Sequence, residues 1–114
     1  MNLMMSKTNI SVIILAAGKG TRMNSDLPKV IHKLSGIPLI CHVAKTALLL
    51  SPNKVVAIIG HQAELVIKAL DKFNIDFCYQ TEQKGTAHAV KQAEKELSEF
   101  KGNSIVLSGD VPLI

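Results

Sequence analysis

Leu15-Ala16-Ala17-Gly18-Lys19-Gly20-Thr21-Arg22-Met23 is the stretch that decides the fold of this chain. It follows an apolar run, residues 10–14, that predicts a buried strand. Its glycines allow backbone conformations that other residues avoid, and three cations, Lys19, Arg22 and Lys29, lie in or just after it. In α/β proteins, a strand that ends in a basic, glycine-rich loop holds phosphate through backbone N–H groups and side-chain charge. The stretch therefore predicts a loop that grips a nucleoside triphosphate.

The composition predicts one small folded domain. The chain has 114 residues, of which 47% are hydrophobic and 19% charged, enough for a single core. Aromatic residues make up only 4%, which argues against the stacking surfaces that bind single-stranded nucleic acid. The net charge of +4 fits either a solvated basic face or an anionic ligand, and no run of Lys and Arg marks a nucleic-acid arm. We expect no nucleic-acid partner.

The cysteines and the hydropathy pattern predict a cytoplasmic protein. Cys41 and Cys78 are isolated and lack the spacing of metal ligands, so we interpret both as buried, reduced thiols. Residues 1–9 are interpreted as a frayed leader and not as part of a signal peptide, because the apolar run that follows is short and continues into the glycine-rich loop. No segment approaches the roughly 18 apolar residues of a membrane span, so no membrane partner is expected.

The rest of the chain alternates strand and helix patterns. Strands are predicted at residues 10–16, 54–60, 75–79 and 104–108, an extended piece at 30–34, and helices at 39–50, 62–72 and 86–100. This order predicts a Rossmann-like three-layer α/β/α fold with a mostly parallel sheet, in which residues 10–114 form one folding unit. The loops at 17–29, 80–86 and 108–112 should converge on one crevice beyond the carboxyl ends of the strands.

Two common phosphate-binding loops do not fit residues 15–29. A P-loop requires two glycines flanking four residues and then Lys with Ser or Thr, which this stretch lacks. A dinucleotide fingerprint requires a third glycine where Met23 stands and an acid at the end of the second strand, where Gly60 and His61 stand. A dinucleotide-dependent dehydrogenase is kept only as an alternative. A nucleotidyltransferase loop, glycine-rich with an Arg and a later Lys, matches throughout.

Three motifs together resemble a known family. Residues 15–23 with Ser25-Asp26-Leu27-Pro28-Lys29 resemble the signature of sugar nucleotidyltransferases. Gln80-Thr81-Glu82-Gln83-Lys84-Gly85-Thr86-Ala87-His88-Ala89 and Ser108-Gly109-Asp110-Val111-Pro112-Leu113 are similar to the uridine-binding loop and the metal-binding turn of one branch. That branch is the uridylyltransferase domain of the bacterial bifunctional N-acetylglucosamine-1-phosphate uridylyltransferase/glucosamine-1-phosphate acetyltransferases. The resemblance implies transfer of UMP from UTP to N-acetylglucosamine 1-phosphate with Mg²⁺, giving UDP-N-acetylglucosamine and pyrophosphate for cell-envelope precursors.

The resemblance also implies roles for the matching residues. Arg22 and Lys29 would be catalytic cations on the triphosphate, and Asp110 would ligate Mg²⁺, which prefers carboxylate and phosphate oxygens. Gln80 would bind the edge of the uracil ring. The implied nucleotide-binding set is Leu15, Ala16, Ala17, Gly18, Lys29, Gln80, Gly85, Thr86, Ser108, Gly109 and Asp110.

The chain departs from this family at its end. It stops at Ile114, so we expect the acceptor-sugar contacts and the second metal ligand to lie beyond it, and no hexapeptide repeat of the acetyltransferase β-helix is present. The expectation is an apparently truncated domain that is inactive or very weakly active alone. Two alternatives stay open: a nucleotide-binding remnant without catalysis, and a related sugar-phosphate nucleotidyltransferase. A half-sheet leaves an edge uncovered, which predicts self-association through that edge.

Overall fold

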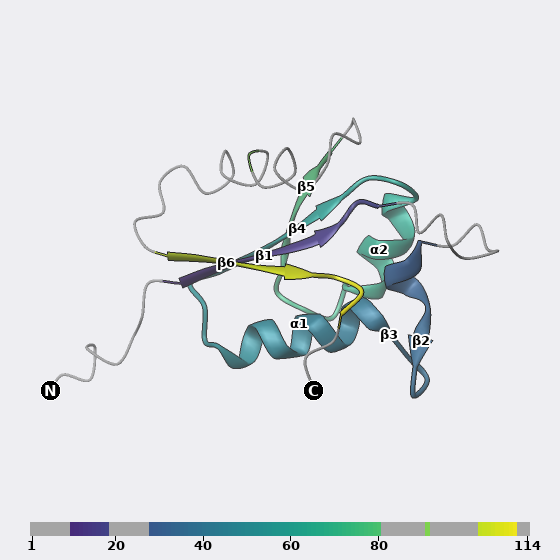
Figure 1. The fold of residues 1–114 in the computed structure, drawn as a ribbon, viewed down its shortest axis with the longest axis horizontal. Helices are drawn as coiled ribbons and strands as arrows, with labels where there is room; N and C mark the ends of the chain where they lie inside the picture. Colours follow the sequence, from purple (N-terminus) through teal and green to yellow (C-terminus); the bar gives the residue numbers. More distant parts are fainter. Residues whose placement is uncertain (1–9, 19–27, 81–90, 92–102, 112–114) are drawn as a thin grey trace, which may run out of the picture.

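The computed structural model describes residues 10–18, 28–80, 91 and 103–111, shown in colour in Figure 1. Four strands form one sheet: β1 (Ile10–Ala16), β4 (Lys54–Ile59), β5 (Asp76–Tyr79) and β6 (Asn103–Ser108). Their order across the sheet is β5-β4-β1-β6, and every pairing is parallel. The predicted parallel sheet is confirmed, and each predicted strand begins and ends within one residue of the observed one.

The two central strands consist of apolar, largely β-branched residues because both faces of the sheet are buried. In β1, Val12, Ile13 and Ile14 have no exposed surface, and residues 56–59 of β4 have none either. Side chains of a strand alternate between faces, so each central strand contributes to two cores. One core holds Val12 and Ile14, and the other holds Ile13.

Helices α1 (Leu39–Leu49) and α2 (Ala63–Ala69) cover the same face of the sheet, with α1 running alongside the strands (Figure 1). Their apolar residues, Ile40, Val43 and Val66 among them, pack in the core that also holds Ile14. The second face of the sheet is buried too, as a three-layer fold requires. The helix predicted at 86–100 lies outside the described residues, apart from Lys91, whose backbone is helical.

The segment between β1 and α1 differs from the prediction. The predicted extended piece at 30–34 is wrong in its first half, where residues Lys29–Ile31 form a short 3₁₀ helix, η2. Strands β2 (Lys33–Leu34) and β3 (Ile37–Pro38) then pair as a hairpin. The turn between them has positive φ at Ser35 (56°) and at Gly36 (78°), as a two-residue hairpin loop of type I′ requires. The predicted turn at Gly36 is therefore confirmed.

Both ends of α1 have a local cause. Pro38 precedes the helix with φ −54°, a value already compatible with the first turn, so its missing N–H costs nothing there. The helix ends where Ser51 adopts φ 50° and donates its N–H to the carbonyl of Leu48 at 3.1 Å. Helix α2 is shorter than the predicted 62–72, because Gln62 is left-handed (φ 50°) and residues 70–72 form turns.

Two other expectations can be compared with the structure. Cys41 and Cys78 are free and buried, as expected, and burial raises the pKa of the Cys41 thiol, which donates to the carbonyl of Ala69 at 3.3 Å. Within the described parts of the chain, no helix combines the length and apolar character needed to span a membrane.

The direction in which the chain adds strands to the sheet reverses at β1, and we call this position the reversal of strand order. The chain passes from β1 to β4 and β5 on one side of the sheet and then returns to β6 on the other side of β1 (Figure 1). In open α/β sheets, ligands bind outside the carboxyl ends of two neighbouring strands whose connections lead to opposite sides of the sheet. The carboxyl ends of β1 and β6 flank that position.

Candidate functional site

The carboxyl ends of β1 and β6 are joined directly. Gly109, the first residue after β6, donates its N–H to the carbonyl of Leu15 at 2.9 Å. A Cβ at position 109 would lie 2.8 Å from that same oxygen and 3.1 Å from Cγ1 of Val30, so only glycine fits without displacement. The turn after β6 is thereby fixed against β1, at the reversal of strand order.

Lys29, in the segment that follows β1, lies close to this turn after β6. Pro28 and Val30 are buried, which anchors η2 under the end of the sheet and leaves Lys29 between them exposed. The Nζ atom of Lys29 lies 3.3 Å from Oδ2 of Asp110. We refer to Lys29, Asp110 and the ends of β1 and β6 as the switch-point site. The predicted phosphate-binding cation and the predicted metal ligand therefore lie together.

Asp110 has a second polar contact. The hydroxyl of Ser108 donates to Oδ1 of Asp110 at 2.5 Å. This hydrogen bond, with a smaller effect from Lys29, outweighs the opposing effect of partial burial and lowers the pKa of the Asp110 carboxyl below its ordinary value. Asp110 is thus ionised at neutral pH, the form in which a carboxylate binds a cation.

Gln80 lies at the same end of the sheet, but two strands, β4 and β1, separate β5 from β6. It follows β5, donates its N–H to the carbonyl of Ile59 at 2.8 Å, and is 5% exposed. Between β5 and β1, His61 donates its N–H to the carbonyl of Ala17 at 3.4 Å, which links the end of β4 to the start of the glycine-rich loop. The carboxyl edge of the sheet therefore holds Gln80 on the flank and the Lys29–Asp110 pair at the reversal.

The other predicted site residues divide into described and undescribed ones. At the end of β1, Leu15 is half-buried, Ala16 and Ala17 are buried, and Gly18 is exposed with no atom within 4 Å of where a Cβ would stand. Arg22, Gly85 and Thr86 lie outside the described residues, so their predicted roles stay predictions.

The donor set at the switch-point site fits a hard cation that is held partly by substrate. No group of three or more His, Cys, Asp or Glu side chains able to hold a metal occurs among the described residues. Mg²⁺ is commonly held by one or two carboxylates, with phosphate and water completing its coordination, so a single ionised Asp110 suits that arrangement. The residues present fit Mg²⁺ bound together with a phosphate chain.

Sequence reasoning missed two features of this site. The bond from the Ser108 hydroxyl to the Asp110 carboxylate was not anticipated, because it joins two side chains and depends on the conformation of the turn that carries them. The packing of Val30 beneath Gly109 was also missed. No local signal reveals it, because it depends on β6 lying beside β1.

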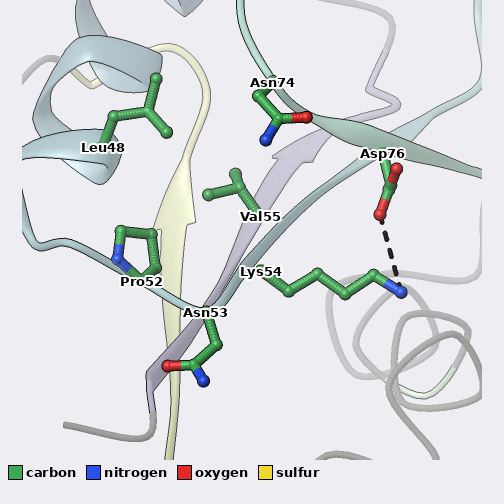
Figure 2. Close-up of a pocket in the computed structure, with 7 residues that line it drawn as sticks. All are labelled: Leu48, Pro52, Asn53, Lys54, Val55, Asn74 and Asp76. Atoms are coloured by element: carbon green, nitrogen blue, oxygen red, sulfur yellow. Dashed lines mark ion pairs between the residues drawn. The ribbon is translucent and has the colours of Figure 1, made fainter. Parts of the chain in front are cut away.

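A separate pocket of about 100 Å³ lies at the opposite end of the sheet, where β4 and β5 begin (Figure 2). In Figure 2, Lys54 and Asp76 extend toward each other at its rim, and their charged atoms lie 3.6 Å apart. Its lining residues are Leu48, Pro52, Asn53, Lys54, Val55, Asn74 and Asp76. None of these was predicted to bind ligand, and the pocket is distinct from the switch-point site.

Comparison with known proteins identifies the family. The profile of the MobA-like NTP transferase domain matches residues 12–114. The chain belongs to the MobA-like NTP transferase domain family. This NTP transferase chain is 56% identical over 102 residues to the bifunctional protein GlmU of Streptococcus agalactiae serotype V, covering 90% of the chain and 22% of that protein. It thus spans about a fifth of the length of the GlmU relatives it matches.

Solved structures agree with the fold of this NTP transferase chain. The CTP:phosphocholine cytidylyltransferase of Streptococcus pneumoniae superposes with a TM-score of 0.76 at 23% identity, covering 90% of this chain and 45% of the other. HddC from Yersinia pseudotuberculosis, complexed with GMP-PN, gives a TM-score of 0.70 at 27% identity, covering 88% and 47%. The Rossmann-like nucleotidyltransferase fold and the resemblance inferred from the three motifs are confirmed.

Proposed function

We propose that the chain binds UTP with Mg²⁺ at the switch-point site, as the nucleotide-binding part of an N-acetylglucosamine-1-phosphate uridylyltransferase. The observation that carries this proposal is the ion pair between Lys29 and Asp110, formed beyond the carboxyl ends of β1 and β6. The 56% identity to GlmU supports uridylyl transfer within the family. The activity would produce UDP-N-acetylglucosamine for peptidoglycan and lipopolysaccharide precursors in the cytoplasm.

The proposed reaction is a direct displacement at phosphorus. An oxygen of the sugar 1-phosphate attacks the α-phosphorus of UTP, the bond to the β-phosphate oxygen breaks, and pyrophosphate leaves. Such reactions require mainly positioning and neutralisation of charge. Lys29 would hold phosphate as a point charge, and the ionised carboxylate of Asp110 would hold Mg²⁺. When bound, Mg²⁺ supplies charge neutralisation to the phosphate oxygens.

The remaining residues would recognise and enclose the nucleotide. Ala16 and Ala17 are buried and Gly18 is exposed, so the main chain becomes accessible at Gly18. This is the carboxyl edge of the sheet, where a ligand would approach. Gln80 would bind the uracil edge. Arg22 would neutralise the leaving pyrophosphate, and Gly85 with Thr86 would close over the base.

Two alternatives to this function remain. The first is transfer of a nucleotidyl group from a nucleoside triphosphate other than UTP, and the second is nucleotide binding without catalysis. The structural likeness to a cytidylyltransferase favours the first of these at the level of fold. Nucleotide binding without catalysis stays the second alternative, since the chain spans 22% of the GlmU length and the activity of that whole protein is a proposal for this chain.

The test is pyrophosphate release by the purified chain supplied with N-acetylglucosamine 1-phosphate, Mg²⁺ and each of UTP, CTP and GTP in turn. Full-length GlmU serves as the positive control. Pyrophosphate should be released with UTP and not with CTP or GTP. If no pyrophosphate is released, nucleotide binding should still be selective for UTP. Preference for CTP or GTP would show that the assigned substrate is wrong, and indifference to every nucleotide would refute the proposed function.

A further inference from the structure

The two carboxylate oxygens of Asp110 have different partners. Oδ1 accepts the hydroxyl of Ser108 at 2.5 Å, while Oδ2 lies 3.3 Å from Nζ of Lys29. A carboxylate can rotate about its side-chain bonds among several rotamers. A hydrogen bond from a neighbouring hydroxyl to one of its oxygens favours the rotamer in which that bond forms. The hydroxyl of Ser108 thus leaves Oδ2 directed toward the β1 side of the reversal.

The backbone that holds Ser108 and Asp110 is itself fixed. Gly109, between them, donates to the carbonyl of Leu15 at 2.9 Å, and Val111 donates to the carbonyl of Ser108 at 3.3 Å. The first bond ties the turn to β1, and the second closes the turn on itself. The main chain therefore holds the Cα atoms of Ser108 and Asp110 in place, and from there the hydroxyl reaches the carboxylate.

We propose that Ser108 is a positioning residue: its hydroxyl fixes the carboxylate of Asp110 so that Oδ2 faces Lys29 in the free chain and is presented to Mg²⁺ in the complex. This inference rests on the proposed function for its Mg²⁺ part. A hydroxyl is suited to the task because it donates one hydrogen bond from a short side chain, which Thr also does and Ala does not.

Direct contact of Ser108 with the nucleotide would be a different role with different consequences. Loss of such a contact would weaken nucleotide binding whether or not Mg²⁺ is present. Loss of a positioning bond would change the side-chain conformation of Asp110 and would weaken only the Mg²⁺-dependent part of binding. The two roles can therefore be separated by comparing conditions with and without the metal.

The first measurement needs no ligand. The three-bond Hα–Hβ couplings of Asp110, measured by NMR, report how many side-chain rotamers it occupies. We expect one dominant rotamer in the wild-type chain and in Ser108→Thr, and averaged couplings in Ser108→Ala. Ser104→Ala is the matched control, because it removes a hydroxyl from the same strand that bonds Ser11 at 2.9 Å and not Asp110. Averaged couplings in the wild type, or unchanged couplings in Ser108→Ala, would overturn the proposal.

The second measurement tests the metal. Mg²⁺ alone is titrated against the chemical shifts of Asp110, and UTP is titrated by calorimetry with Mg²⁺ or with EDTA. In Ser108→Ala, we expect the apparent affinity for Mg²⁺ and for UTP–Mg²⁺ to fall by about threefold to tenfold, the usual net effect of one hydrogen bond, with restoration in Ser108→Thr. Equal affinities in the wild type and Ser108→Ala, or an equal loss in EDTA, would overturn positioning. Absence of UTP binding by the wild type would refute the proposed function instead, leaving the rotamer and Mg²⁺ results to decide the role of Ser108.

Discussion

Lys29 and Asp110 form an ion pair in which Nζ and Oδ2 are 3.3 Å apart, although Lys29 follows β1 and Asp110 follows β6. In the free chain these two opposite charges neutralise one another. In the proposed function, a metal-bound triphosphate would offer each residue a new partner: phosphate for Lys29 and the cation for Asp110. The pair thus keeps both groups in place at little cost, because half of the Lys29 side chain is exposed.

Lys29→Met should weaken binding of UTP–Mg²⁺ by about tenfold, since it removes a charge-assisted contact to phosphate. Its effect on the free energy of unfolding should stay below about 1 kcal/mol, because the pair is partly exposed and screened. Calorimetry and urea unfolding measure the two effects. Lys54→Met is the matched control, as it breaks an exposed ion pair with Asp76 at the opposite end of the sheet. Equal losses of UTP affinity in the two variants would contradict a role for Lys29 at the site.

The lowered pKa of Asp110 predicts a pH dependence with a definite sign. The hydrogen bond from Ser108 is the main cause, followed by Lys29, so the folded chain binds this proton less readily than the unfolded chain does. The resulting stabilisation is complete above the ordinary value of 3.8 and is lost as the pH falls through the folded pKa.

A ¹³C titration of the Asp110 carboxyl should therefore give a midpoint below 3.8, and Ser108→Ala should move it upward. Lys54→Met should leave the midpoint where it is. A midpoint at or above the ordinary value in the wild-type chain would show that the Ser108 bond does not persist in solution.

Gly109→Ala should destabilise the fold by about 1–3 kcal/mol, the usual range for inserting a methyl group into filled space. The new Cβ would meet the Leu15 carbonyl at 2.8 Å and would separate the ends of β1 and β6. Urea unfolding measures the loss. Gly18→Ala is the control, since nothing lies within 4 Å of its added Cβ. We expect Gly18→Ala to keep the stability of the wild-type chain and to lose affinity for UTP. A Gly109→Ala variant as stable as the wild-type chain would contradict the described contact.

The strand β6 predicts self-association of the chain. In the described sheet it pairs with β1 alone, it carries no charge, and Val106 is 43% exposed, whereas natural edge strands are usually guarded by charges or Pro. Sedimentation should show an average mass that rises with concentration, and Val106→Lys should suppress the rise. Tyr79→Lys on the opposite edge strand is the control. A wild-type chain that stays monomeric at every concentration would contradict this prediction.

The sheet could be predicted from sequence because its strands carry their own signal. Apolar, β-branched runs bounded by Gly, Pro or Asn mark β1, β4 and β6, and the alternation with helices implies parallel pairing. The short η2 and the β2–β3 hairpin could not be predicted in the same way. Elements of two or three residues are held by contacts such as the bond from Leu39 N–H to the carbonyl of His32 at 2.9 Å, which no local pattern encodes.

The sequence predicted the site residues and the end of the sheet where their loops should converge, but not which side chains are in contact there. The motifs named Lys29, Ser108 and Asp110 separately. Their meeting depends on β6 returning to the side of β1, a choice of strand order that periodicity does not specify. Gln80 lies at the same edge of the sheet, with two strands between β5 and β6, and its predicted role at the base stays a prediction.

The most direct test of the switch-point site is calorimetric titration of the chain with UTP in the presence of Mg²⁺, repeated with Asp110→Asn. Asn keeps the size of the side chain and removes the charge that would hold the cation. We predict saturable binding of UTP by the wild-type chain, dependent on Mg²⁺, and a loss of affinity of at least about tenfold in Asp110→Asn. Wild-type affinity in Asp110→Asn, or the same affinity with and without Mg²⁺, would contradict the account.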